Sequence, residues 1–488
     1  MKMHLVSLLG LAVSFAVPMF AQEKRAVLAS NPPSDAYTTT VAYVETFYPL
    51  WFTYHQGGLG NGNQLIGPER VSPLYHVVVA INDDTIYCSA YLNLTNEPAI
   101  VTIPSTVSPD PCTGETSVTY SILTLDSYCD VFPSGIPDGA PPVAGGTYAL
   151  TGPAWTGTLP QEVTHHVQMP VNFPTLVFRI DKYHAVDPPD YENQINQAEL
   201  FRLLLRLQTL SDYMDCPNYG GRTQLLPEIV FSIPFKTVAD AEIANDPIAF
   251  LQQLQTAVAS SRTPQLTPHE QALSDHFNDL FGTGNVGKHS DFALGAQAAH
   301  STILDNYLTH QGPNTNHWIH FTNIGSWNDE NIDEAIDRSS ITEFIQYANG
   351  IKAAAYYHTF SDSGGYPLNG DNPHGYVMTF PPSPVPGGQA GPEASRFWSL
   401  TAYTPKAIEL VPNVINKYVV ASYTGAQLNP DGSLSVYMAT ERPPGVPIEN
   451  WLPIPSGPFN IMLRVYGVVS GSPVEDNTYV PPAIDRAD

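Results

Sequence analysis

The hydrophobic pattern changes its period twice along the 488 residues of the chain. From Val77 to about Tyr183, short runs alternate between apolar and polar side chains, and Pro or Gly separates the runs. From Asn196 to about Tyr357 apolar residues recur at helical spacing, and alternation returns after the Gly/Pro-rich stretch 363–391. A period of two residues predicts half-buried strands, whereas a period near 3.6 predicts helices. The chain is therefore expected to contain two β regions separated by a helical one.

This pattern predicts a mainly β protein with a helical middle, divided into several domains because the chain is too long for one hydrophobic core. Residues 35–190 are predicted to form a helix and a β-sandwich, residues 191–360 a helical region, and residues 361–488 a second β-sandwich. Helices are expected from Asn196 to Tyr213 and from Ser340 to Tyr357, and the strands expected include residues 85–94, 99–103, 397–403 and 434–439. Local signals support these elements. Thr267–Glu270 reads as a capping box at a helix start, and Asn429–Gly432 reads as a turn between strands.

The first residues have the layout of a secretory signal peptide, predicted as residues 1–21. A short basic start precedes an apolar run from Leu5 to Phe20, and Ala21 closes it. Residues 22–34 are expected to be a linker or a propeptide, since Lys24-Arg25 reads either as a dibasic processing point or as an exposed pair. No later run is apolar for 18 residues, so we expect a secreted protein with no membrane span.

Two further features agree with export. Asn93-Leu94-Thr95 is an acceptor sequence for N-glycosylation, at the end of a predicted strand. The chain has four cysteines, an even number, and one or two disulfides are expected in an oxidising compartment. They are Cys88, Cys112, Cys129 and Cys216. Three pairings are open, of which we favour a bridge among the first three; the spacing matches no zinc motif.

Charge excludes one class of partner. Only 20 Lys and Arg stand against 46 Asp and Glu, which gives a formal net charge of -26. Such a surface repels the phosphates of nucleic acid and anionic membranes. We therefore expect neither a nucleic acid nor a membrane as a partner. A small-molecule or saccharide ligand is expected instead from the aromatic and amide side chains considered below. The sequence leaves the oligomeric state and any cofactor unknown, since the Gly/Asn-rich loop 57–63 matches no phosphate-binding motif.

Two ordered sets of motifs carry a family resemblance. The first set is Asn82–Tyr87, Tyr120 with Asp126–Tyr128, and Gly145–Gly157. The second set is Arg396–Tyr403, Pro412–Asn416, Asn429–Leu434, Asn450–Phe459 and Leu463–Gly467. The first resembles the family called domain of unknown function 1254, and the second resembles domain of unknown function 1214. The resemblance implies an immunoglobulin-like sandwich, a helical insert and a jelly-roll-like sandwich, and it implies no reaction. His165-His166 and the stretch from Met214 onward depart from the pattern.

Three residues are the candidates for catalysis at the junction of the β regions. Asp84 and Tyr87 are tentative acid–base groups, and Arg396 is a tentative clamp for a carboxylate. Alternatives stay open for each. Asp83 and Asp84 can instead bond backbone N–H groups in a turn, and Arg396 can form a structural ion pair with Asp or Glu.

Aromatic and amide side chains suggest a binding groove. Its tentative members are Trp398, Asn413, Trp451 and Arg464, with the alternative that the tryptophans pack in a core. His317, His320, His358 and His374, with Asp362 or Asp371, were weighed as metal ligands. Their spacing matches no strong signature, so no metal site is predicted. The chain has no G-x-S-x-G elbow either.

Three hypotheses about function follow. The first is a secreted enzyme of the hydrolase or lyase type, acting on a small or saccharide-like substrate at the junction of the β regions. The second is a non-catalytic module that binds glycan or another extracellular ligand. The third is a structural protein that associates with itself, as jelly rolls do in coats.

Overall fold

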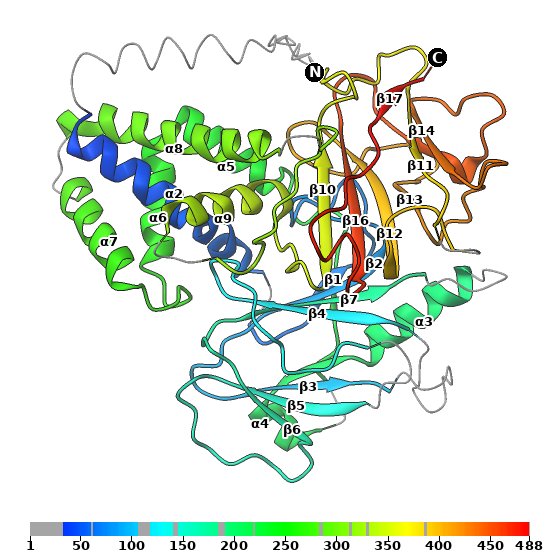
Figure 1. The fold of residues 1–488 in the computed structure, drawn as a ribbon. Coiled ribbons are helices and arrows are strands. Elements are labelled where there is room, and N and C mark those ends of the chain that lie inside the picture. The colour runs from blue at the N-terminus through cyan, green and yellow to red at the C-terminus, as the bar shows by residue number, and fades with distance from the viewer. Residues whose placement is uncertain are drawn as a thin grey trace, which may run out of the picture.

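The computed structural model describes residues 33–59, 62–105, 118–139, 145–183, 191–217, 220–282, 286–311, 315–327, 331–384 and 388–487. The predicted signal peptide and Cys112 lie outside these residues. Figure 1 shows three parts: a helical part, an N-terminal β unit below it, and a C-terminal β unit beside it. None of the described helices is both long and apolar enough to cross a membrane.

The N-terminal β unit contains two sheets. In the first, the order is β4 (Tyr120–Leu125), β7 (Thr175–Asp181), β2 (Thr85–Tyr91), β1 (Ile66–Pro68) and β9 (Gln224–Leu226). In the second, it is β6 (His165–Gln168), β5 (Gly146–Thr151), β3 (Ala99–Ile103) and β8 (Arg206–Thr209). Both sheets contribute to one core, in which Phe178 and Leu150 pack with Phe201 of α3 (Tyr191–Leu204).

The C-terminal β unit also contains two sheets. One has the order β10 (Ala354–Thr359), β16 (Asn460–Val468), β12 (Ala394–Tyr403) and β13 (Val419–Ala421). The other has the order β15 (Trp451–Pro453), β14 (Leu434–Ala439), β11 (Tyr376–Phe380) and β17 (Asp485–Arg486). Their facing side chains form one core. The predicted turn before β14 is confirmed, since Gly432 N–H donates to Asn429 C=O and Gly432 has a φ of +85°.

The helical part is assembled from distant segments. It consists of α2 (Asp35–Gln56), α5 (Phe235–Asn245), α6 (Pro247–Val258), α7 (Pro268–Phe281), α8 (His289–Thr309) and α9 (Ile332–Ile345). Tyr43 of α2 stacks on Phe277 of α7, and Phe47 shares a core with Phe250 and Ile303. The first helix, predicted together with the N-terminal sandwich, thus packs into the helical part. The capping box at Thr267 and Glu270 is confirmed.

Helices are more abundant than a mainly β protein would have. In the described residues they span slightly more of the chain than the strands do, so the fold is mixed α and β. Element boundaries also differ from the sequence pattern. The helix expected through Tyr213 ends at Leu204, and β8 and the short α4 (Leu210–Asp215) follow. The helix expected from Ser340 to Tyr357 gives way to β10, because a strand buried on both faces shows no alternation to separate it from a helix.

Candidate functional site

A cleft of about 1170 Å³ lies between the helical part and the C-terminal β unit. One wall comes from α5, α8 and α9, and the other comes from segment 360–376 and from residues just before β16 and in β17. The helical wall carries the apolar side chains of Leu304, Leu308 and Phe344 beside a group of charged side chains. The opposite wall carries Tyr366, with Arg486 lying 5.0 Å from its ring centre. The cleft has the size and the mixed lining of a site for a small organic molecule.

Four ionisable side chains meet where α5, α8 and α9 converge on this cleft. Lys236 and Asp240 lie one turn apart on α5, so both point to the same side of that helix. His300 lies on the buried face of α8, and Glu343 lies on α9. We call Lys236, Asp240, His300 and Glu343 the ionic cluster.

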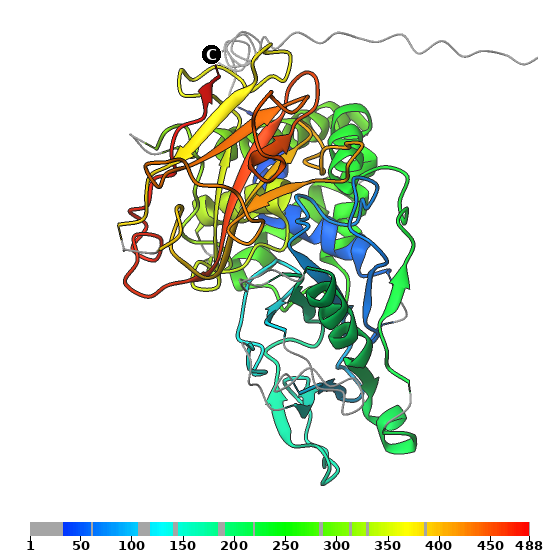
Figure 2. The same ribbon diagram turned by 90° about the vertical axis from the view of Figure 1, so that its right-hand side faces the viewer.

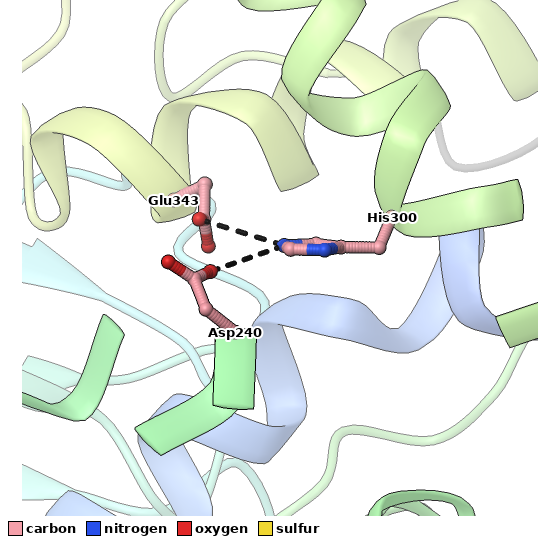
Figure 3. Close-up of side chains that lie close together, drawn as sticks. All are labelled: Asp240, His300 and Glu343. Carbon is pink, nitrogen blue, oxygen red and sulfur yellow. Dashed lines mark ion pairs between the residues drawn. The ribbon is translucent and has the colours of Figure 1, made fainter. Parts of the chain in front are cut away.

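Figure 3 shows the imidazole of His300 directed at the two carboxylates. Its Nε2 lies 3.3 Å from Asp240 Oδ1 and 3.6 Å from Glu343 Oε1. The Lys236 ammonium lies 3.1 Å from Asp240 Oδ2 and makes a shorter ion pair with Glu343. The hydroxyl of Tyr48 donates to the second oxygen of Glu343. Both carboxylates therefore face two cationic side chains.

Exposure decides which members face the cleft. The Asp240 side chain is 34% exposed and that of His300 is 11% exposed, whereas Lys236 retains 4% and Glu343 none. Lys236 and Glu343 form the buried base of the ionic cluster. Asp240 and His300 are the members that a bound molecule would meet.

The pKa values also separate the buried Glu343 from Asp240 and His300, which face the cleft. Burial alone would raise the pKa of Glu343, but the charges of Lys236 and His300 hold it well below its usual range. Burial would lower the pKa of His300, but the carboxylates of Asp240 and Glu343 raise it to about 9. Burial, followed by the charge of Glu343, raises the pKa of Asp240. At neutral pH His300 is thus a charged acid beside a carboxylate whose affinity for protons is increased.

Asp240, His300 and Glu343 are also the group that could hold a metal ion, since one ligand atom from each lies within 4.8 Å of the others. The ammonium of Lys236 already contacts both carboxylates and takes the position of a cation. With two cationic and two anionic side chains, the ionic cluster is balanced without a metal. Its composition therefore fits proton transfer better than metal binding.

The residues predicted for catalysis lie elsewhere, at the junction of the β units. Asp84 is buried and accepts hydrogen bonds from Ser399 Oγ, at 2.8 Å, and from the Tyr423 hydroxyl. Arg396 forms a two-point ion pair with Asp181. Tyr87 donates to Asn82 Oδ1 at 2.9 Å. The structure brings these three side chains to one junction, but each of them is bonded to a residue outside the predicted site. Arg396 therefore has the structural ion pair that was its alternative interpretation.

The predicted binding groove is not assembled. Trp398 is 2% exposed and packs on Phe380 in the core of the C-terminal unit. Trp451 donates its indole N–H to Ala439 C=O, and Asn413 bonds Val411 and Lys417 in its own loop. These three side chains stabilise corners and core instead of presenting a surface for sugar stacking. Arg464, the fourth, is buried and donates to Ala80 C=O.

Two of the histidines weighed for metal binding, His320 and His358, have structural partners at both ring nitrogens. His358 is bonded to the Tyr307 hydroxyl and to Asn460 Oδ1, both at 2.7 Å. Burial lowers its pKa to about 3. His320 contacts Tyr356 C=O and Asn477, and Asp362 pairs with Arg486. These contacts use both nitrogens of each ring and leave none for a metal.

Cys88, Cys129 and Cys216 are free thiols, the first two buried. No two of these three form a bridge with each other, so a disulfide requires Cys112, outside the described residues. Burial raises the pKa of the Cys88 thiol to about 12. Asn93 is exposed, with its Oδ1 bonded to Thr95 N–H, so the acceptor sequence is open to solvent.

The sequence did not predict the ionic cluster, because residues 236, 240, 300 and 343 do not follow the spacing of any known motif. Two signals existed. Lys236 and Asp240 have the i, i+4 spacing of an ion pair, in a chain that has few lysines. His300 interrupts the apolar face of α8 that Phe292, Ala296 and Ile303 form. A polar residue on such a face needs a partner, but the sequence does not say which residue that is.

Comparison with known proteins matches both β units to families without an assigned activity. Residues 62–200 match the family described as protein of unknown function DUF1254, and residues 353–469 match the family described as protein of unknown function DUF1214. The chain therefore carries this pair of families in the predicted order. The first match begins just before β1 and ends within α3, and the second begins just before β10.

One solved structure supports the fold, and a second is more distantly similar. The crystal structure of the VPA0106 protein from Vibrio parahaemolyticus is 19% identical, with a TM-score of 0.55, and the alignment covers 93% of this chain and 99% of that one. A putative uncharacterized protein from Burkholderia cenocepacia is 13% identical over 95% of this chain and 96% of that one, with a TM-score of 0.41. No curated protein matches the chain. The comparisons thus leave the chemistry to the residues themselves.

Proposed function

We propose that the protein is an enzyme that uses acid–base chemistry, of the hydrolase or lyase type, on a small organic molecule bound in the cleft beside the ionic cluster. The observation that carries this proposal is the position of Asp240 and His300 at the wall of a cleft of about 1170 Å³, above a buried Lys236–Glu343 ion pair. The proposed site lies in the cleft beside the helices and not at the junction of the β units, where Asp84, Tyr87 and Arg396 are each bonded to other side chains.

The division of roles follows from charge and exposure. Lys236 and Glu343 are buried and ionised, and they hold the carboxylate and the imidazole of their neighbours in place. His300 carries a proton at neutral pH and can donate it to a leaving group, while Asp240 can accept one. Phe344, Phe360 and Leu304 would cover an apolar part of the substrate, and Arg486 and Lys406 would attract an acidic group.

A panel of chromogenic p-nitrophenyl esters and glycosides, with apolar and acidic variants, tests the proposal. We expect turnover of at least one class, reduced about 100-fold or more by His300→Ala and by Asp240→Asn, since general acid–base groups contribute about 10²–10⁴ in rate. His289→Ala on the same helix and Asp279→Asn are matched controls, since both side chains are exposed. Full turnover in the His300 and Asp240 variants would refute the assignment. Binding of panel members without turnover would indicate a ligand-binding protein instead.

We also infer that the protein is secreted and that its β units are immunoglobulin-like and jelly-roll-like sandwiches. The exposed acceptor at Asn93 and the apolar run from Leu5 to Phe20 support export. The single core shared by the two sheets of each unit supports the sandwiches. Expression in a eukaryotic secretory host should yield a glycoprotein in the medium, and Asn93→Gln should remove its glycan mass. Retention of the unmodified chain inside the cells would contradict secretion.

A further inference from the structure

A second, much smaller cavity of about 50 Å³ lies where all three parts of the molecule meet. Its walls come from segment 75–82, from β2 and β7, from residues at the end of α9, and from β10 and β16. Figure 2 shows the C-terminal sheets meeting the N-terminal β unit in this region. The polar side chains that line it include Arg179, Arg464, Tyr356 and Tyr466. We call it the arginine cavity.

Two buried guanidinium groups line the arginine cavity, and among the described residues neither has a carboxylate within ion-pair distance. Arg179 is 5% exposed and Arg464 is 2% exposed. Arg179 donates to Asn349 Oδ1 at 3.0 Å and to Tyr347 C=O at 2.7 Å, and Arg464 donates to Ala80 C=O. Arg179 Nε and Arg464 Nη1 have no hydrogen-bond partner among the described residues. Buried charges of this kind are normally paired, because desolvation costs several kcal/mol per ion.

Two hydroxyl groups of the arginine cavity, those of Tyr356 and Tyr466, each have a hydrogen available to donate. Tyr466 accepts from Asn82 Nδ2 at 2.9 Å, and Tyr356 accepts from the side-chain and backbone N–H groups of Asn349. Each hydroxyl has one hydrogen of its own to donate, and no hydrogen bond from either to another described residue is formed. Burial raises the pKa of Tyr466, so its hydroxyl remains protonated.

The neighbouring carboxylates are already occupied. Asp181 is held by Arg396 and Asp83 by Lys182. Asp84 accepts from Ser399 and Tyr423, and no oxygen of Asp84 lies within ion-pair distance of either guanidinium among the described residues. Counting Arg179, Arg464 and Asp84 together leaves a surplus of one positive charge. One monovalent anion would neutralise it and would accept from the free donors.

We propose that the arginine cavity binds a small monovalent anion, either a halide or a planar oxyanion such as formate or nitrate. The volume admits only a few heavy atoms, so the site excludes larger organic acids. The anion would join segment 75–82, the end of α9 and both β units through one set of hydrogen bonds. This site is separate from the cleft and does not depend on the proposed enzymatic function.

Thermal denaturation in chloride-free gluconate buffer, at constant pH and ionic strength, tests the proposal. Replacement of gluconate by chloride, formate or nitrate should raise Tm along a saturating curve for at least one of these anions. Arg464→Met should weaken half-saturation roughly tenfold or more, because a charge-assisted hydrogen bond contributes about 1.5–3 kcal/mol. Arg70→Met, which removes an exposed arginine, should leave the curve unchanged. If Arg464→Met does not fold, Tyr466→Phe should weaken half-saturation in the same direction.

Bromide-soaked crystals provide the direct observation. An anomalous peak between Arg179 and Arg464 would locate the anion. The absence of a peak, together with a linear Tm response that is equal for all salts, would overturn the proposal and leave water as the occupant of the cavity.

Discussion

The ionic cluster and the arginine cavity are both buried charged sites where parts of the chain converge, yet they differ in balance. The ionic cluster sets Lys236 and His300 against Asp240 and Glu343, so its charges cancel within the chain. In the arginine cavity, Arg179 and Arg464 contact amide and carbonyl oxygens and, in the part of the chain that the structure describes, no carboxylate. An isolated buried charge is costly. The cancelling charges of the ionic cluster therefore indicate that it needs no bound ion, whereas the net positive charge of the arginine cavity indicates that an anion from solution binds there.

Breaking the balanced site should have the largest effect. Glu343→Ala leaves Lys236 and His300 facing only Asp240, and we expect a loss of about 3–5 kcal/mol in the free energy of unfolding. The double variant Lys236→Met/Glu343→Met removes both charges and should lose less than the single variant. Urea denaturation of both variants measures this difference. A double variant less stable than Glu343→Ala would show that the loss in the free energy of unfolding comes from the missing ion pair and not from the unpaired charge.

The balanced site should also make stability depend on alkaline pH. His300 has a pKa near 6.5 when unfolded and about 9 in the folded protein. Its contribution is therefore complete below pH 6.5 and is lost as the pH rises through 9, to a total of about 3 kcal/mol. His300→Ala should flatten this part of the stability profile, whereas His289→Ala should retain it. An unchanged slope in His300→Ala would mean that His300 is neutral in the folded protein.

Removal of a charge from the arginine cavity should reduce the free energy of unfolding by less. In gluconate buffer we expect Arg464→Met to lose about 1–2 kcal/mol, because the lost hydrogen bond to Ala80 C=O is partly offset by removal of an unpaired buried charge. In the anion that raises wild-type Tm the loss should be larger. Equal losses in both buffers, measured by urea denaturation, would remove the distinction between the two sites.

The smallest effect is expected from a single hydroxyl of the arginine cavity. Tyr466→Phe keeps the ring and removes the acceptor of Asn82 Nδ2, at a cost of about 1 kcal/mol in gluconate. Calorimetry in the presence of the bound anion should show an additional loss. Tyr48→Phe, which removes the donor to Glu343 in the ionic cluster, should show no dependence on the anion.

The local hydrophobic pattern predicted most strands of the β units, but it did not predict which elements pack against each other. β2, β3, β12 and β14 follow the expected runs closely, and the capping box of α7 begins where Thr267 predicts. The placement of α2 against α7 and α8 was not predictable in this way, because an amphipathic helix shows which face is buried but not what covers it. β10 was assigned to a helix for the related reason that a fully buried strand has no polar face.

By itself the sequence determined the order of strand-rich and helix-rich regions, the resemblance to the two families, and the acidic net charge. These depend on composition, on spacing over a few residues, or on motifs in order along the chain. Only the tertiary structure decided which charges meet. Residues 236, 300 and 343 come together across three helices, and Arg179 and Arg464, from different β units, line one cavity. Such arrangements depend on how the helices and strands pack. The residues are far apart in the sequence, so no local pattern predicts that they come together.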